Sequence, residues 1–355
     1  MANNMANEID IKSLTLPELT EAMVNIGEPK FRAKQIYKWL HQRNVADFSQ
    51  MSDLSKPLRE KCSLNFYINS INIKKKLVSA LDGTVKYLYG LSDGNTVEAV
   101  LMKYNHGTSL CISTQVGCRM GCTFCASTIG GLVRGLTPAE MLDEVYTASA
   151  DSGEKITSIV LMGIGEPLDN YDNVTKFMGI LSSPEGINLS LRHLSLSTCG
   201  LVDMIDILAE SRLPLTLSVS LHAPNDNIRR ATMPVAKKWP MDELLDSCAR
   251  YFAKTGRRIS FEYALIDGHN DREAHARELG QKLNMLRKKG MQCHVNLIPV
   301  NSVDGNSYKQ SQKNAIARFV AVLEGLGITA TVRRKLGADI NAACGQLRRQ
   351  DSVSV

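Results

Sequence analysis

The sequence predicts an α/β protein whose main body is a partial parallel barrel of the (βα)6 type, similar to a TIM barrel, preceded by a helical domain and a β extension. Between residues 109 and 333, short apolar runs typical of strands alternate with amphipathic segments typical of helices. Helix-start signals recur between these runs, as in Thr137-Pro138-Ala139-Glu140. Repeated strand–helix units form parallel sheets, which right-handed crossovers curl into a barrel or part of one. Side chains at the carboxyl ends of the strands would then form the functional site.

The first hundred residues carry different signals. The run Thr15-Leu16-Pro17-Glu18 has the pattern of a capping box with proline early in the helix, and a second, basic helix is expected from 30 to 44. Residues 66–104 alternate in the manner of strands, with turn signals at Asp82-Gly83 and Asp93-Gly94. A small helical domain followed by a β extension is therefore expected.

The elements of the barrel follow in order along the chain. Strands are expected at 109–116, 156–162, 193–198, 215–221, 258–266, 292–298 and 327–333. Helices beyond the one that Thr137 caps are expected at 170–183, 201–211, 241–255, 271–290 and 307–326. These boundaries predict a helical accessory domain at 1–64, a β extension at 65–104, a barrel at 105–334 and a tail at 335–355.

Composition limits the classes of protein to which the chain can belong. No apolar run approaches the length of about 18 residues that spans a bilayer, and Met1 to Glu8 lacks the apolar stretch of a signal peptide, so a cytosolic protein is expected, with a monomer as the default. The nine cysteines are an odd number and widely spread, which argues against a disulfide framework and for metal or redox chemistry. The net charge of +6 is compatible with a polyanionic partner, although solvated lysines give the same total.

Three cysteines give the strongest chemical signal. Cys118, Cys122 and Cys125 have the spacing C-x3-C-x2-C on one short loop. Zinc fills a tetrahedron with four ligands, whereas three thiolates can hold three corners of a [4Fe–4S] cube and leave the fourth iron open to a substrate or cofactor. Buried thiols or an incomplete zinc site are the alternatives, and Phe124 before the last cysteine favours the cluster.

Polar residues follow several of the expected strands. The run Gly163-Ile164-Gly165-Glu166-Pro167 lacks the ending of a phosphate-binding P-loop, so on its own a plain tight turn explains it equally well. Ser197, the run Ser220-Leu221-His222 and Asn301 also lie at expected strand ends, where hydroxyls could hold a ribose or a carboxylate. Ordinary hydrogen bonding within loops is the alternative for these side chains.

Three further residues gain meaning only from their context. Cys344 follows the last expected strand and is flanked by small residues, and a cysteine there is normally a small apolar filler. Cys111 would ordinarily be a core thiol on the same strand that leads to Cys118. Glu98 lies in the alternating run Thr96–Val100, where it would ordinarily face solvent.

Taken together, these motifs resemble one family, the radical S-adenosylmethionine (radical SAM) RNA methyltransferases of the RlmN type, with the Cfr type as a relative. The resemblance covers essentially the whole chain. It rests on the runs 111–118, 118–125, 163–170, 220–226, 296–301 and 342–347. Pro167 and Pro299 follow the RlmN-type pattern, which favours methylation of adenine carbon 2 over carbon 8.

The resemblance implies the cofactors and their ligands. Cys118, Cys122 and Cys125 would bind a [4Fe–4S] cluster whose open iron chelates SAM, and two SAM molecules would be used in each turnover. The implied SAM contacts are Gly165, Glu166, Ser197, Ser220, Leu221, His222 and Asn301.

The resemblance also implies a catalytic sequence, which a radical route requires because carbon 2 is too electron-poor to attack the methyl group of SAM. Cys344 would first take a methyl group from one SAM by displacement. A 5′-deoxyadenosyl radical from the second SAM would remove a hydrogen from that methyl group, and the carbon radical would add to the ring. Glu98 would accept the ring proton, and Cys111 would attack Cys344, leaving a Cys111–Cys344 disulfide that must be reduced.

The implied partners are 23S rRNA near the peptidyl-transferase centre, tRNAs modified beside the anticodon, and an electron donor of the flavodoxin or ferredoxin type; no membrane is expected. The target nucleotide must be unstacked to reach a buried cluster. The basic helix at 30–44 and Lys74 to Lys76 are candidates for contact with the RNA backbone, with solvated charge as the alternative. Nothing in the residues alone selects either RNA.

Three other functions remain open at the level of sequence. A carbon 8 methyltransferase would use the same cysteines. A radical SAM activase that makes a glycyl radical on a partner protein would have no need for Cys111 or Cys344. A non-catalytic RNA-binding protein with a structural metal would be colourless and would not cleave SAM.

Overall fold

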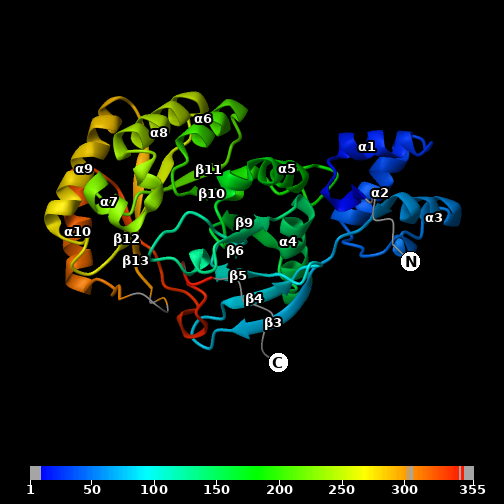
Figure 1. The fold of residues 1–355 in the computed structure, drawn as a ribbon, viewed down its shortest axis with the longest axis horizontal. Coiled ribbons are helices and arrows are strands. Elements are labelled where there is room, and N and C mark those ends of the chain that lie inside the picture. Colours follow the sequence, from blue (N-terminus) through cyan, green and yellow to red (C-terminus); the bar gives the residue numbers. More distant parts are fainter. Residues whose placement is uncertain (1–8, 302, 304–306, 344, 348–355) are drawn as a thin grey trace.

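The computed structural model describes residues 9–301, 303, 307–343 and 345–347. Its main element is a 10-stranded sheet in the order β14-β13-β12-β11-β10-β9-β6-β5-β4-β3 (Figure 1). The parallel part consists of β14 (Ala330–Val332), β13 (Cys293–Pro299), β12 (Ile259–Leu265), β11 (Thr216–Ser220), β10 (Leu194–Thr198), β9 (Ile156–Leu161) and β6 (Gly107–Cys111). Because β14 and β3 are edge strands that do not pair with each other, the sheet forms part of a barrel, which confirms the predicted fold class.

Helices connect the parallel strands. In Figure 1, α6, α8, α9 and α10 form an outer layer around β10 to β13. The helices that accompany the parallel strands are α4 (Pro138–Ser152), α5 (Tyr171–Leu181), α6 (Val202–Ser211), α7 (Asp226–Thr232), α8 (Met241–Thr255), α9 (Glu273–Lys288) and α10 (Lys313–Gly325). The start of α4 is a capping box in which Thr137 and Glu140 satisfy each other's backbone N–H groups, as the sequence predicts.

The amino-terminal helices lie at the opposite end of the molecule from α9 and α10 (Figure 1). They are α1 (Leu16–Asn25), α2 (Phe31–His41) and α3 (Lys56–Asn65), with a small parallel pair of β1 (Ile9–Asp10) and β2 (Phe66–Tyr67). Two buried contacts attach them to α4. Lys12 forms an ion pair with Asp143 at 2.7 Å, and His41 Nδ1 lies 3.0 Å from the hydroxyl of Tyr146.

The β extension continues the main sheet in antiparallel fashion through β5 (Thr96–Tyr104), β4 (Val85–Gly90) and β3 (Asn72–Val78). In the register of β5 and β6, Val100 lies opposite Cys111. The carboxyl-terminal segment packs on the same strands, because Asp339 accepts a 2.7 Å hydrogen bond from the hydroxyl of Ser79. The tail is therefore held against the β extension.

Two predicted elements differ from the structure. The expected strand 109–116 is interrupted, because Thr114 leaves the main sheet to donate to the carbonyl of Ile164, and β7 (Gln115–Gly117) pairs instead with β8 (Leu132–Gly135). Cys111 and Cys118 are therefore not on one strand. The expected helix 307–326 begins only at Lys313, because Gln310 makes an isolated β-bridge with Ile266.

Candidate active site

The three cysteines of the predicted cluster motif lie on the loop that follows β7. Cys118 and Cys122 are buried and Cys125 is half-buried. Gly117 and Gly121 turn this loop with φ angles of 78° and 71°, a region that favours glycine. A β-carbon on Gly117 would collide with the carbonyl oxygen of Gly131, so the close approach of the two chain segments requires glycine at that position.

The three cysteines line one cavity together with the carboxyl ends of the parallel strands. The cavity encloses about 820 Å³ of empty space, counting the part open to solvent. The predicted site residues that line it are Cys118, Cys122, Cys125, Gly165, Glu166, Ser197, Ser220 and His222. Leu221 is fully buried and is not part of the wall, and Asn301 lines a neighbouring cavity.

The turn after β9 brings a carboxylate to this cavity. Gly165 has a φ of 106°, and a β-carbon there would lie 2.6 Å from Cβ of Gln115. The side-chain oxygen of Gln115 accepts a 2.9 Å hydrogen bond from the backbone N–H of Glu166. Only glycine at 165 lets the turn lie this close to Gln115, and this packing fixes the position of Glu166.

Glu166 is itself held by backbone donors. One carboxylate oxygen accepts from the N–H of Cys199 at 2.7 Å, and the other accepts from the N–H of Leu168 at 3.1 Å. Burial raises the pKa of Glu166, while these hydrogen bonds oppose the shift. The side chains of Cys199 and Thr198 also hydrogen-bond to this carboxylate, so it is held in one orientation at the wall of the cavity.

His222 faces the same cavity as a neutral donor. Its Nδ1 accepts a 2.8 Å hydrogen bond from the N–H of Ala264, which leaves the ring proton on Nε2. Burial, with a smaller contribution from Arg229, lowers the pKa of His222 to about 3. The ring packs edge-on against Phe124, with 4.9 Å between ring centroids, and so joins the end of β11 to the cysteine loop.

The donor set fits an iron–sulfur cluster. Burial raises the pKa of Cys118 to about 12 and also raises that of Cys122, so these thiols ionise only beside a strong positive charge. Within the part of the chain that the structure describes, no group of three or more His, Cys, Asp or Glu side chains is placed to hold a single metal ion. Three thiols spread around one cavity match a cube of four irons better than one ion.

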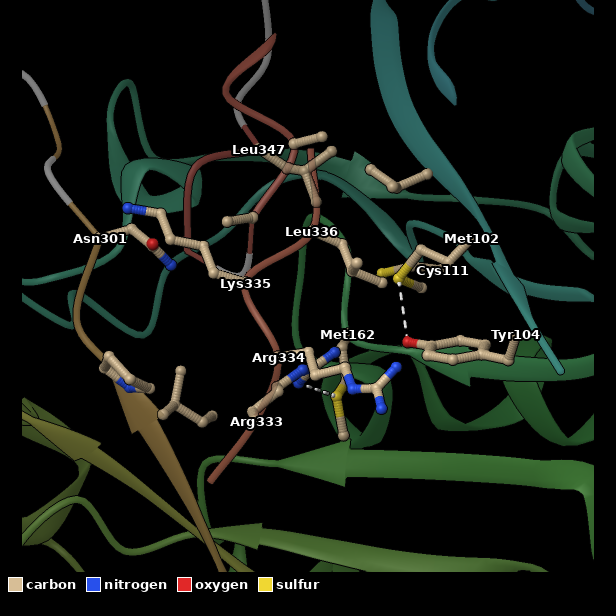
Figure 2. Close-up of a pocket in the computed structure, with 15 residues that line it drawn as sticks. Met102, Tyr104, Cys111, Met162, Asn301, Arg333, Arg334, Lys335, Leu336 and Leu347 are labelled. Carbon is tan, nitrogen blue, oxygen red and sulfur yellow. Dashed lines mark hydrogen bonds between the residues drawn. The ribbon is translucent and has the colours of Figure 1, made fainter. Parts of the chain in front are cut away.

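A second cavity adjoins the first (Figure 2). Its wall contains Cys111 and Asn301, and it shares Met162, Ile298 and Leu347 with the first cavity. Apolar side chains from β5, β6 and the tail pack together here, Val100 and Ala342 among them. The two cavities thus meet at the carboxyl ends of β9 and β13.

Glu98 is on the β5 face that borders this second cavity. It alternates with Val100 and Met102, which both line the cavity, so the three side chains share one face of β5. Glu98 is fully buried, so the solvent-facing alternative is wrong. It forms a 2.9 Å ion pair with Lys86, which also donates to the carbonyl of Asn341 at 3.0 Å.

Cys344 lies outside the described residues, and so does the predicted Cys111–Cys344 pairing. Its chain neighbours are described: Ala343 lines the second cavity and Gly345 lines the first.

Comparison with known proteins identifies the family. Residues 9–68 match the model of the ribosomal RNA large subunit methyltransferase N-terminal domain, and residues 112–279 match that of the radical SAM superfamily. A probable dual-specificity RNA methyltransferase RlmN from Alkaliphilus oremlandii is 56% identical over 97% of this chain and 98% of its own length. The chain belongs to the RlmN family of radical SAM RNA methyltransferases.

Other members of the family support the same assignment. The Lachnoclostridium phytofermentans protein of the same description is 53% identical over 98% of this chain and 96% of its own length. A crystal structure of a radical SAM methyltransferase from Sphaerobacter thermophilus matches with a TM-score of 0.89 and 41% identity, covering 96% of this chain and 99% of that one. Membership in the RlmN family implies a [4Fe–4S] cluster and SAM as cofactors.

Several side chains of this RlmN-family site were not predicted from the sequence. Glu262 lines the first cavity, where it accepts 2.7 Å hydrogen bonds from the hydroxyl of Ser260 and the amide of Asn296. Polar residues at two alternating positions of an apolar strand were the signal that could have found it. Arg229 is fully buried and donates to the carbonyl of Cys199 at 2.7 Å; the sequence offers no signal for that contact.

Proposed function

We propose that the chain methylates carbon 2 of adenosine in two kinds of RNA, with adenosine 2503 of 23S rRNA and adenosine 37 of tRNAs as the targets. The names of the relatives, which describe dual-specificity RNA methyltransferases, support two substrates. Pro167 and Pro299, which follow the RlmN-type pattern, support carbon 2 over carbon 8.

The observation that carries the proposal is the junction of the two cavities. One cavity contains the three cysteines and Glu166, and the other contains Cys111. Ala343 and Gly345 belong to different walls, so the tail passes from one cavity to the other. The described neighbours of Cys344 thus reach both cavities, which supports a tail residue that receives a methyl group from one cavity and delivers it to the other.

The residues of the first cavity would bind the cofactors. Cys118, Cys122 and Cys125 would hold the [4Fe–4S] cluster, which when bound supplies the electron that cleaves SAM. Glu166 would accept hydrogen bonds from the amino group of SAM, and Nε2–H of His222 would donate to it. The hydroxyls of Ser197 and Ser220, at the ends of β10 and β11, would bind its ribose or carboxylate.

The second cavity would serve methyl transfer and release. In the proposed sequence the Cys344 thiolate displaces the methyl group of one SAM, forming an S–C bond and releasing S-adenosylhomocysteine. Once the methyl carbon is bonded to the ring, Glu98 accepts the proton from the ring carbon. Loss of one electron and of this proton restores the aromatic ring. The Cys111 thiolate then attacks the sulfur of Cys344, and the S–C bond breaks with its electron pair moving to the former methyl carbon, which takes up a proton to become the methyl group. A disulfide forms between the two cysteines.

That disulfide must be returned to two thiols by two electrons before the next turnover. The proposal therefore includes an electron donor of the flavodoxin or ferredoxin type. It also includes a second SAM in each turnover, and a monomer that acts in the reducing cytosol. Within the described residues, none of the helices combines the length and apolar character needed to cross a bilayer.

The test is methylation in vitro by the full chain. The reconstituted protein is incubated anaerobically with SAM, reductant and either a 23S rRNA fragment or a tRNA transcript, and digested nucleosides are analysed by liquid chromatography and mass spectrometry. The expected product is 2-methyladenosine in both RNAs, with methylated Cys344 in peptides from protein treated without RNA. Formation of 8-methyladenosine, or unmodified RNA with unmodified Cys344, would overturn the proposal.

A variant pair tests the cluster ligands separately. Cys122→Ala is expected to lose the iron, the acid-labile sulfide and the brown absorption of the reconstituted protein. Cys62→Ala, which removes a buried thiol from α3, is expected to keep all three. Equal iron and sulfide contents in the two variants would exclude Cys122 as a ligand.

A further inference from the structure

Three consecutive basic residues line the second cavity beside the thiol of Cys111. Arg333, Arg334 and Lys335 follow directly on β14, and their side chains surround the same hollow as Cys111 and Tyr104 (Figure 2). Among the described residues that line this cavity there is no aspartate or glutamate. The wall is otherwise largely apolar.

Arg334 and Lys335 are exposed, and neither makes an ion pair with any residue in the described part of the chain. Three of the basic residues first considered for RNA contact differ in this respect. Lys34 and Lys38 of α2 both pair with Glu185, and Lys76 of β3 pairs with Asp151. The positive charge of Arg334 and Lys335 is therefore less compensated than that of Lys34, Lys38 and Lys76.

The chemistry of the cavity wall suits a nucleotide. Tyr104 is half-buried in the wall and stacks on His106, with 5.2 Å between ring centroids and 18° between ring planes. Apolar side chains such as Val100 and Ile298 complete the wall. An aromatic ring and apolar walls accommodate an unstacked base, and neighbouring guanidinium and ammonium groups bind phosphate.

We propose that Arg334 and Lys335 bind the phosphodiester backbone of the substrate RNA at the mouth of the second cavity, so that the target adenine enters beside Tyr104. This inference rests on the proposed function, since it requires an RNA substrate. The two charges hold the strand on both sides of the unstacked nucleotide, which places the base over Cys111. A free anion such as inorganic phosphate would use the cations but not the apolar walls.

The experiment measures the binding of a fluorescein-labelled tRNA transcript to the full, reconstituted chain by fluorescence anisotropy, at KCl concentrations from about 50 to 200 mM. In the double variant Arg334→Met with Lys335→Met, the slope of log affinity against log salt concentration is expected to fall by about 1 for each lost phosphate contact. The affinity at low salt is expected to fall about tenfold. Binding of SAM, measured by equilibrium dialysis, is expected to stay at the wild-type value.

The matched control removes the same charge elsewhere. Lys288 and Lys289 are exposed at the carboxyl end of α9, which leads into the amino-terminal end of β13, away from the cavities. Lys288→Met with Lys289→Met should keep the wild-type salt slope. The charge-conserving variant Arg334→Lys with Lys335→Arg should restore most of the slope.

The possible outcomes separate the two proposals. A wild-type salt slope in the Arg334 and Lys335 variant would overturn the phosphate site. An equal decrease of the slope in the Lys288 and Lys289 control would overturn it as well. Neither result would contradict the proposed methylation of RNA. If the Arg334 and Lys335 variant lost SAM binding together with RNA binding, the phosphate site would also be overturned, because Arg334 and Lys335 would then be needed for the fold and not for contact with RNA. Absence of RNA methylation by the wild-type chain would instead reject the proposed function, whatever the slopes.

Discussion

Lys86 Nζ lies 2.9 Å from a carboxylate oxygen of Glu98, and both side chains are buried between the β extension and the tail. The same ammonium group donates to the carbonyl of Asn341 at 3.0 Å. One lysine thus joins the proposed proton acceptor to the segment that leads to Cys344. A buried charge of this kind is stable only while its partner is present.

Replacement of Lys86 by methionine is therefore expected to lower the free energy of unfolding by about 3–5 kcal/mol, because it removes the cation that forms the buried ion pair with the Glu98 carboxylate. The measurement is urea denaturation of the full chain. Lys103→Met is the control: it breaks the exposed 2.7 Å pair with Glu154, which should cost less than about 1 kcal/mol. Equal losses of unfolding free energy in the two variants would show that the buried ion pair contributes no more to stability than the exposed one.

Gly165→Ala tests the turn that presents Glu166. A β-carbon at φ 106° is strained and would meet Gln115, so we expect a loss of about 1–3 kcal/mol in stability and a marked loss of SAM affinity in equilibrium dialysis. Gly179→Ala in α5 is the matched control, since nothing lies within 4 Å of the added carbon and alanine favours helix. Wild-type SAM affinity in Gly165→Ala would show that the turn tolerates a side chain.

Acid should destabilise the chain partly through His41. Burial and nearby Lys12 lower the pKa of His41 to about 3 from an ordinary value of 6.5, so between these values the unfolded chain binds the proton that the folded chain excludes. The contribution of His41 to the free energy of unfolding is present above pH 6.5 and decreases as the pH falls below that value. From about pH 7.5 to pH 5.5 the loss is about 1.4 kcal/mol.

The variant His41→Gln should remove that part of the pH dependence, measured as the difference in unfolding free energy between these two pH values. His193→Gln, at an exposed position, serves as the control and should keep the wild-type difference. An unchanged pH dependence in His41→Gln would indicate that other groups account for the acid sensitivity.

Much of the fold could be predicted because its signals are local. Thr15 and Thr137 begin helices with hydrogen bonds to glutamates three residues later, and such pairs are visible in the sequence. The early end of β6 could not be predicted, because Thr114 leaves the sheet for a carbonyl of Ile164, far along the chain. Periodicity reports which residues are apolar, not which distant strand receives their hydrogen bonds.

The same distinction applies to the site. The spacing of the cysteines fixes them on one loop, so their common cavity follows from local sequence. The burial of Glu98 depends on the register of β4 against β5 and on a tail more than two hundred residues away, so the alternating pattern alone suggested a solvent-facing side chain. The ion pair with Lys86 needed the folded chain to be seen.

The buried guanidinium of Arg229 supports the proposed SAM site through one residue, Cys199. The guanidinium donates to the carbonyl of Cys199 at 2.7 Å, and the backbone N–H of Cys199 donates to Glu166 at 2.7 Å. Arg229 also donates to the carbonyl of Trp239 at 3.3 Å, so it joins the end of β10 to the segment before α8. Loss of the guanidinium would leave buried carbonyls without donors.

Both Arg229→Met and Arg229→Lys are expected to lose about 2–5 kcal/mol of stability, since each unsatisfied buried group costs about 1–3 kcal/mol and lysine cannot reach both carbonyls from one nitrogen. SAM affinity should fall as well, because Cys199 no longer fixes Glu166. The control Arg250→Met breaks an exposed pair with Asp206 and should cost less than about 1 kcal/mol with SAM binding intact. If Arg229→Lys bound SAM as the wild type does, positive charge alone would suffice, and the hydrogen bond to Cys199 would have no part in orienting Glu166.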